Sequence, residues 1–67
     1  MIRCNLSTMM GARKLKVSDV ERETGLHRHK ITALYKETAV KVDLDTIDKL
    51  CEFFYCSVGE LFEIVAG

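Results

Sequence analysis

Residues 17–36 read VSDVERETGLHRHKITALYK, and this stretch predicts two short helices joined by a turn at Gly25. Its apolar residues recur at the spacing of helices with one buried stripe: Val20, Leu26, Ile31, Leu34 and Tyr35. Glycine readily adopts the left-handed conformation that ends a helix and turns the chain sharply. We therefore expect one helix over about residues 17–24, and a second that starts with His27 near its N-cap and ends near Lys36.

The second of these helices is expected to expose a short basic face that carries hydrogen-bonding groups and no acid: Arg28, His29, Lys30, Thr32, Ala33 and Lys36. DNA phosphates attract positive charge, and base edges in the major groove offer donors and acceptors. The face therefore suits a helix that lies in a major groove. The alternative is a basic face that is simply solvated, which is the commoner situation across proteins.

Two segments of the chain resemble the small phage repressor and Cro-type (XRE-like) regulators. The first is the run V-x-x-V-x-x-x-T-G-L-x-R-x-x-I-x-x-L, from Val17 to Leu34, which is similar to their helix-turn-helix. The second is DLDTIDKLCEFFYCSVGELFEIV, from Asp43, which is similar to their closing pair of helices. The resemblance extends over about residues 6–65 and implies an all-α, lambda-repressor-like bundle of five short helices. It also implies a transcriptional regulator that binds a specific sequence in double-stranded DNA.

The resemblance also implies which residues contact DNA. In the family's docking mode the start of the second helix of the motif meets base edges, and its far end meets the backbone. The base-reading candidates are Arg28, His29, Lys30, Thr32 and Ala33. Among them, Arg28 can make a bidentate contact to guanine, and Ala33 can meet a thymine methyl group. The phosphate-binding candidates are Lys16, Val17, His27, Lys36, Thr38 and Lys41.

Three positions depart from the family's pattern. Relatives usually carry a polar residue, often Gln, where this chain has Val17, and more often Ser or Thr where it has His27. They carry a small Ala where it has Glu21, at the contact between the two helices of the motif. A buried and unpaired carboxylate is costly. We therefore expect Glu21 either to tilt outward or to pair with a basic neighbour, with Arg22, Arg28 and Lys30 as candidates.

Length and charge narrow the class of protein further. The chain has 67 residues, no proline and 48% hydrophobic residues, which predicts one compact helical domain over residues 1–67. Its net charge is zero, but residues 1–41 carry nine Lys or Arg against four acids. Residues 42–67 carry one Lys against six acids. We therefore expect one basic and one acidic face, with the reading helix in the basic half.

Several functional classes receive no support from the sequence. No signal peptide and no membrane span stand out, which favours the cytoplasm. The three cysteines fit reduced thiols, since Cys51-x4-Cys56 and His27-x-His29 lack the tight ligand pairs of a structural zinc site. No catalytic pairing or Gly-rich phosphate loop stands out. We expect no enzymatic activity, no metal and no cofactor, and a redox or metal sensor ranks third among the alternatives.

The rest of the chain predicts three more helices. The first covers residues 2–13 and is followed by Leu15, which is expected to enter the core. A later helix opens at the N-cap Asp43, and its core stripe is Leu44, Ile47, Leu50, Cys51 and Phe54. The last opens at a capping box from Ser57 to Glu60. It is expected to bury Val58, Leu61, Phe62 and Val65.

Some apolar residues near the C-terminal end do not fit these stripes, which predicts a homodimer. The interface candidates are Phe53, Tyr55, Ile64 and Val65. The alternative is a few scattered hydrophobic residues on a monomer surface. A rival function is a protein-interaction module, antitoxin-like or anti-repressor, which keeps the scaffold without reading DNA. Its support is the zero net charge and the departures at Val17 and Glu21. A DNA reader can also contact RNA polymerase or a regulatory protein.

Overall fold

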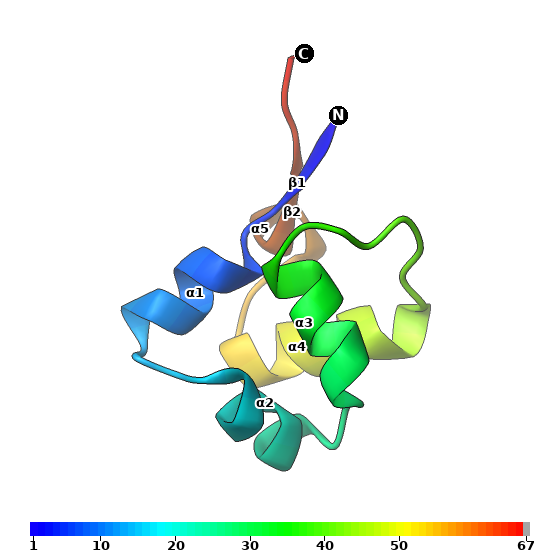
Figure 1. The fold of residues 1–67 in the computed structure, drawn as a ribbon. Coiled ribbons are helices and arrows are strands. Elements are labelled where there is room, and N and C mark those ends of the chain that lie inside the picture. The colour runs from blue at the N-terminus through cyan, green and yellow to red at the C-terminus, as the bar shows by residue number, and fades with distance from the viewer. Residues whose placement is uncertain (67) are drawn as a thin grey trace.

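Five helices and one small antiparallel sheet make up residues 1–66, the part of the chain that the computed structural model describes (Figure 1). In chain order the elements are β1 (Ile2–Cys4), α1 (Leu6–Ala12), α2 (Val17–Thr24), α3 (Arg28–Tyr35), α4 (Leu44–Phe54), α5 (Val58–Leu61) and β2 (Phe62–Ile64). The five helices fit the expected bundle. The expected all-α class is not exact, because the first and last segments pair as strands.

The sheet joins the two ends of the chain in register, with Ile2 opposite Ile64 and Cys4 opposite Phe62. The prediction of a helix over residues 2–13 is therefore wrong at its start, and α1 begins at Leu6. The last helix likewise ends at Leu61, so Phe62 lies in a strand. Ile2, Arg3 and Cys4 alternate in polarity, which suits a strand once a partner strand is present.

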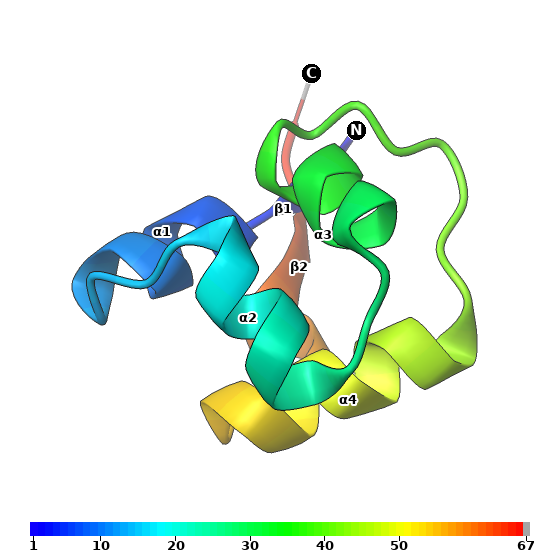
Figure 2. The same ribbon diagram turned by 60° about the horizontal axis from the view of Figure 1, so that its bottom comes forward.

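The core lies where the helices converge between the sheet and α2 (Figure 2). Its buried apolar residues are Cys4, Leu6, Met10, Val20, Leu26, Ile31, Leu34, Leu50, Phe54 and Leu61. Leu15 is half-buried and packs against this cluster, as expected. Ile47 and Cys51 of the predicted α4 stripe are half-buried, and Val65 is half-buried beyond β2.

Three residues that were expected in the core are exposed instead. The exposed fraction is 43% for Tyr35, 83% for Leu44 and 54% for Val58. Each stands at a helix end, where helical spacing no longer determines which neighbour covers the side chain: Tyr35 ends α3, while Leu44 and Val58 begin α4 and α5. On α4 Leu50 is fully buried as expected, and Thr46 is fully buried as well, with its hydroxyl donating to Asp43 Oδ1 at 2.7 Å.

The predicted N-caps of α4 and α5 are confirmed. Asp43 Oδ2 accepts the Thr46 N–H at 3.2 Å at the start of α4. Ahead of α5, Ser57 Oγ accepts the Glu60 N–H at 3.2 Å, and Glu60 Oε1 accepts the Ser57 N–H at 2.9 Å. The hydrogen bond from the Ser57 backbone lowers the pKa of Glu60, because it favours the charged carboxylate.

Arg13 ties the end of α1 to the end of α4. Its guanidinium donates to the Phe54 carbonyl at 2.9 Å and to the Phe53 carbonyl at 3.3 Å, and it lies 4.9 Å from the Phe54 ring centroid. The last carbonyls of a helix carry partial negative charge, so a cation is favourable there. The sequence analysis did not assign this role to Arg13.

The three cysteines are free thiols in the structure. Cys4 is buried, and burial raises its pKa; Cys51 and Cys56 are half-buried. Within residues 1–66 no three His, Cys, Asp or Glu side chains gather as a metal site would require. Among the helices of the same residues, none has the length and apolar content to cross a membrane.

Candidate DNA interface

The turn between α2 and α3 is held by its own side chains and backbone. Gly25 adopts the left-handed conformation with φ +74°, and its N–H donates to the Glu21 carbonyl at 2.9 Å. The Thr24 hydroxyl donates to the Val20 carbonyl at 2.6 Å and accepts the Leu26 N–H at 3.2 Å. The predicted turn is therefore confirmed, and it fixes the angle at which α3 leaves α2.

Burial of one side of α2 and α3 leaves the other side of α3 facing outward. Val20 and Ile31 are fully buried, and Leu26 and Leu34 are nearly so. The two helices lie side by side, joined by the short turn (Figure 2). This packing is the arrangement that the sequence analysis expected for a helix-turn-helix.

Glu21 is half-buried at this contact and forms none of its three predicted pairings in the structure. Within residues 1–66 no basic side chain lies within 4.0 Å of its carboxylate. Arg22 pairs with Asp19 instead, at 3.1 Å, and Lys30 pairs with Asp43 at 3.2 Å. The half-exposed carboxylate therefore keeps its contact with solvent.

His27 is the N-cap of α3, as predicted. Its Nδ1 accepts the His29 N–H at 3.2 Å, which satisfies one of the free amides of the first turn. The two imidazole rings also stack, with centroids 4.9 Å apart and planes 15° apart. The start of α3 therefore presents two neighbouring imidazoles beside Arg28.

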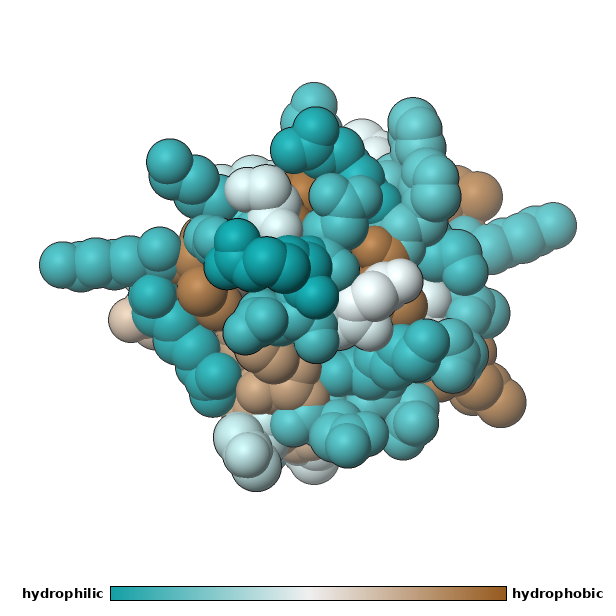
Figure 3. All heavy atoms as spheres, turned by 90° about the horizontal axis from the view of Figure 1, so that it is seen from below, coloured by the Kyte–Doolittle hydropathy of each residue, from teal (hydrophilic) through white to brown (hydrophobic). Residues whose placement is uncertain are grey.

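The candidate reading face of α3 is polar and accessible. Arg28, His29 and Lys36 are exposed, and Thr32 and Ala33 are half-buried one turn beyond the start. Residues three and four apart share a face, so these side chains form one strip. The face that contains α2 and the start of α3 is mostly hydrophilic, with small apolar areas between the polar side chains (Figure 3).

Lys30 turns away from this strip toward the start of α4. Its Nζ lies 3.2 Å from Asp43 Oδ1, and the same carboxylate accepts the Thr46 hydroxyl. Hydrogen bonds from Thr46, and then from Lys30, lower the pKa of Asp43 to about 2. Lys30 therefore links α3 to α4.

The phosphate-binding candidates lie at helix ends and in the following loop. Lys16 is exposed, and its N–H donates to Asp19 Oδ2 at 2.9 Å, a bond that lowers the pKa of Asp19. Val17 is half-buried, and its side chain packs against the core. In the loop after α3, Lys41 and Thr38 are exposed, and the Thr38 N–H already donates to the Ala33 carbonyl at 2.9 Å.

Ion pairs join the basic and acidic halves of the sequence. Lys30 pairs with Asp43, and Arg3 lies 4.0 Å from Glu63 across the sheet. Within residues 1–66 the exposed cations Arg28, Lys36 and Lys41 form no ion pair. Exposed Lys14 and Lys16 form none either within the same residues, so positive charge that is available to a ligand lies on α3, on the loop after it and on the connection before α2.

The four predicted interface residues do not form one patch. Phe53 and Tyr55 lie at the end of α4, where they line a hollow with Arg13 and Glu23. Ile64 belongs to the sheet, which lies away from the end of α4 (Figure 1). Phe53 and Tyr55 thus lie at one place and Ile64 at another, and the interface role of all four residues stays a prediction.

These features define a helix-turn-helix protein of the class that binds DNA. Comparison with known families matches residues 5–67 to the Cro/C1-type HTH DNA-binding domain. The chain therefore belongs to this family, as the resemblance implied. Membership of a DNA-binding family makes double-stranded DNA its partner, without saying which sequence it binds. Neither the curated proteins nor the solved structures contain a match to it.

Proposed function

We propose that this chain reads a specific sequence in double-stranded DNA with α3 in the major groove, and that it acts as a homodimeric transcriptional regulator in the cytoplasm. The observation that carries the proposal is the strip on α3, where exposed cations flank Thr32 and Ala33 and no acid interrupts the face. The regulator acts by occupancy, because bound protein blocks or recruits RNA polymerase. Occupancy needs no enzymatic step and no cofactor.

Sequence preference would come from the first two turns of α3. The Arg28 guanidinium has the fork geometry for the two acceptors of a guanine, a contact worth about 1–3 kcal/mol of discrimination. Thr32 offers a hydroxyl to a base edge, and the Ala33 methyl suits a thymine methyl. His29 stands beside Arg28, with its orientation set by the stack on His27.

Lys30 was expected to read bases, but in this proposal it has a structural role. Its ammonium is engaged by Asp43, so its contribution is to position α3 against α4. Affinity independent of sequence would come from phosphate contacts by Lys16, Lys36, Lys41, Thr38, His27 and the Val17 backbone amide. Such contacts release counterions, so binding weakens as salt rises.

A second candidate function is a protein-interaction module built on the same scaffold. The half-buried Val17 and the carboxylate of Glu21 at the motif support it, since both depart from the pattern of a DNA reader. The two functions differ in what a change at Arg28 does. A DNA reader loses specific binding while its fold stays intact, whereas an interaction module is indifferent.

The test is selection from a randomised double-stranded DNA pool at a low and a high salt concentration, followed by sequencing. Enrichment of a short motif, with binding that weakens as salt rises, is the expected result. Arg28→Ala should abolish the preference at one base position, while the matched control Arg3→Ala, on the sheet, should leave the motif unchanged. A pool without any enriched motif at either salt would overturn the proposal and favour the interaction module.

A further inference from the structure

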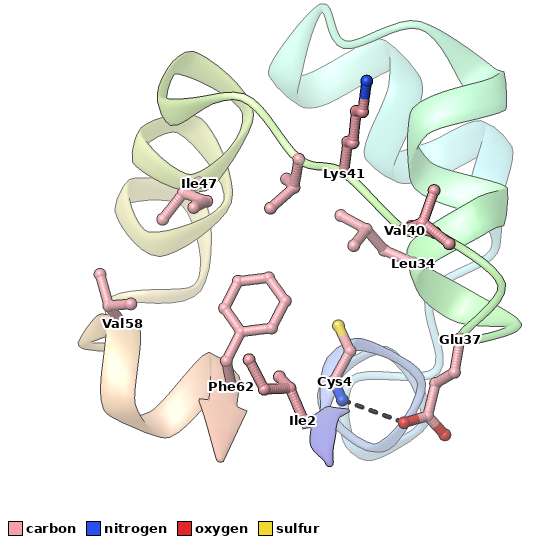
Figure 4. Close-up of a pocket in the computed structure, with 11 residues that line it drawn as sticks. Ile2, Cys4, Leu34, Glu37, Val40, Lys41, Ile47, Val58 and Phe62 are labelled. Carbon is pink, nitrogen blue, oxygen red and sulfur yellow. Dashed lines mark hydrogen bonds between the residues drawn. The ribbon is translucent and has the colours of Figure 1, made fainter. Parts of the chain in front are cut away.

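A hollow of about 410 Å³ lies between the small sheet, the loop after α3 and the helices α4 and α5 (Figure 4). Each of these elements and α3 contributes apolar side chains to its lining, among them Ile2, Leu34, Val42, Ile47, Val58 and Phe62. Pockets that bind small molecules have volumes of about 300–1,000 Å³ and are lined mainly by apolar side chains. The hollow therefore has the size and the lining of a small-molecule site.

The apolar side chains of this hollow are only partly covered by the protein itself. The exposed fraction is 68% for Ile2 and 54% for Val58, and Ile47 and Phe62 are half-buried. The Cys4 sulfur points into the hollow (Figure 4), and burial raises the pKa of this thiol, so it carries no charge at neutral pH. Removing apolar surface from water is favourable. A ligand with an apolar body would therefore be stabilised here.

Two charged side chains within residues 1–66, Glu37 and Lys41, line the hollow, and they differ in their partners. Glu37 Oε1 accepts the Cys4 N–H at 3.0 Å, so this carboxylate is already engaged, and its charge disfavours an anion at that end (Figure 4). Lys41 is exposed and has no ion-pair partner within the same residues. Its ammonium is directed away from Ile2 and Cys4 (Figure 4). The free charge at the hollow is therefore positive and lies at the end opposite the sheet.

A smaller hollow adjoins the first one on the side of Lys41. It shares Leu34, Lys41 and Val42 with the larger hollow and adds Lys30 and Asp43, whose side chains pair at 3.2 Å. Two ammonium groups and one carboxylate therefore meet at this junction, which leaves one positive charge in excess. An anionic head group suits this end, whereas a cationic one would be repelled.

We propose that the hollow binds a medium-chain fatty acid, with its hydrocarbon chain over Ile2 and Phe62 and its carboxylate beside the Lys41 ammonium. The chain takes up the uncovered apolar surface, and the carboxylate supplies the partner that Lys41 lacks. Lys41 is also a candidate for binding a DNA phosphate, so a bound fatty acid neutralises a charge that DNA binding uses. This competition rests on the proposed function, whereas the binding of the fatty acid does not.

The first test titrates the full chain, without DNA, with sodium decanoate below its micelle-forming concentration and follows the backbone amides by NMR. Amide signals of lining residues such as Val42, Val58 and Phe62 should shift and reach saturation. From hexanoate to decanoate, each added methylene should tighten binding by up to about fourfold, because each buries more apolar surface. Decyltrimethylammonium has the same hydrocarbon chain with the opposite charge and should bind more weakly than decanoate.

Three variants separate the contributions of the hollow and of its charge. Val58→Asp places a carboxylate in the lining at the first residue of α5, where the helix dipole favours an acid. It should abolish saturable decanoate binding while the circular dichroism spectrum stays unchanged. Lys41→Gln should weaken decanoate binding by up to about fivefold, the size of an exposed charge pair. The matched control Lys14→Gln removes an exposed, unpaired cation outside the hollow and should bind decanoate like the wild type.

Several outcomes would overturn the proposal. These are the absence of saturable shifts in the lining amides, wild-type decanoate binding by Val58→Asp, and a loss in Lys14→Gln as large as that in Lys41→Gln. Equal or tighter binding of decyltrimethylammonium would show that positive charge at the hollow does not select the ligand. Lining amides that shift with protein concentration alone would show that a second copy of the chain covers the hollow instead.

The second test measures the affinity for double-stranded DNA with and without saturating decanoate. The wild type should bind DNA more weakly when decanoate is present, and its salt slope should fall by about one ion, because one phosphate contact is lost. Val58→Asp should show neither change. An unchanged affinity in the wild type would overturn the competition for Lys41. The first test uses no DNA, so failure of the fatty-acid site is distinguishable from failure of the proposed DNA reading.

Discussion

Gly25 and Gly11 form a pair whose replacement by alanine should have opposite effects on stability. Apart from the chain neighbours and, for Gly11, the backbone of its own helix, no atom lies within 4 Å of the place where a Cβ would stand, so neither position has a tertiary clash. What differs is the backbone. Gly25 is held at φ +74°, whereas Gly11 lies within α1.

The magnitude follows from this backbone difference. A non-glycine residue in the left-handed conformation costs about 1–2 kcal/mol, so Gly25→Ala should lower the melting temperature by roughly 5–15 °C in a chain of this size. Alanine in a helix is favoured over glycine by about 0.5–1 kcal/mol, so Gly11→Ala should raise the melting temperature by a few degrees. Gly25→Asn should fall between Gly25→Ala and the wild type, because asparagine tolerates the left-handed region.

The assay is thermal unfolding followed by circular dichroism, with urea titration for the free energy of unfolding. Specific DNA binding by Gly25→Ala should fall at temperatures where the variant unfolds and recover on cooling. A neutral or stabilising Gly25→Ala would refute the reasoning, because the turn would then not require a left-handed residue. The parallel result for Gly11→Ala shows whether the assay resolves effects of this size.

Three further predictions concern the start of α3, its link to α4 and its far end. His27→Ala should cost about 0.5–2 kcal/mol of unfolding free energy through loss of the N-cap acceptor, whereas His27→Ser should restore most of it in urea titrations. The pKa of Asp43 is lowered to about 2, so its carboxylate stabilises the folded state above its ordinary pKa, and this stabilisation is lost as the pH falls toward 2. Asp43→Asn should therefore flatten the decline in melting temperature across that acidic range, and an unchanged acid dependence would contradict the assignment. Lys36→Ala should reduce the salt slope of DNA binding by about one ion while leaving the selected motif unchanged, and an altered motif would contradict a phosphate-binding role.

The helix-turn-helix could be predicted from sequence because its determinants are local. Gly25, the stripe through Val20 and Ile31, and the cap at His27 all lie within one short stretch, and the structure confirms each. The N-caps at Asp43 and Ser57 could likewise be predicted, because each involves residues within a single helical turn. Such features depend on residues that are close together in the sequence, so one amino-acid sequence is enough to predict them.

The errors arise where a residue depends on a partner distant in sequence. Residues 2–4 were included in the helix expected over residues 2–13, because their partner strand β2 lies at the other end of the chain. We expected Lys30 to read bases and expected no particular contact from Arg13. The length and flexibility of such side chains let the fold decide where the charge goes, and here it goes to the end and the start of α4. The base-reading and phosphate-binding roles stay predictions.

The hydrogen bond from Cys4 to Glu37 has a consequence for the outer edge of β1. An open strand edge is a template on which another strand can pair. The Glu37 carboxylate occupies the outward Cys4 N–H, so an added strand would find no free donor at this residue. Ile2 lies in a non-bonded pair with Ile64, so its N–H and C=O also point outward, and the carboxylate covers only the part of the edge next to α1. A residue just after α3 thus shields part of a strand that is distant from it in sequence.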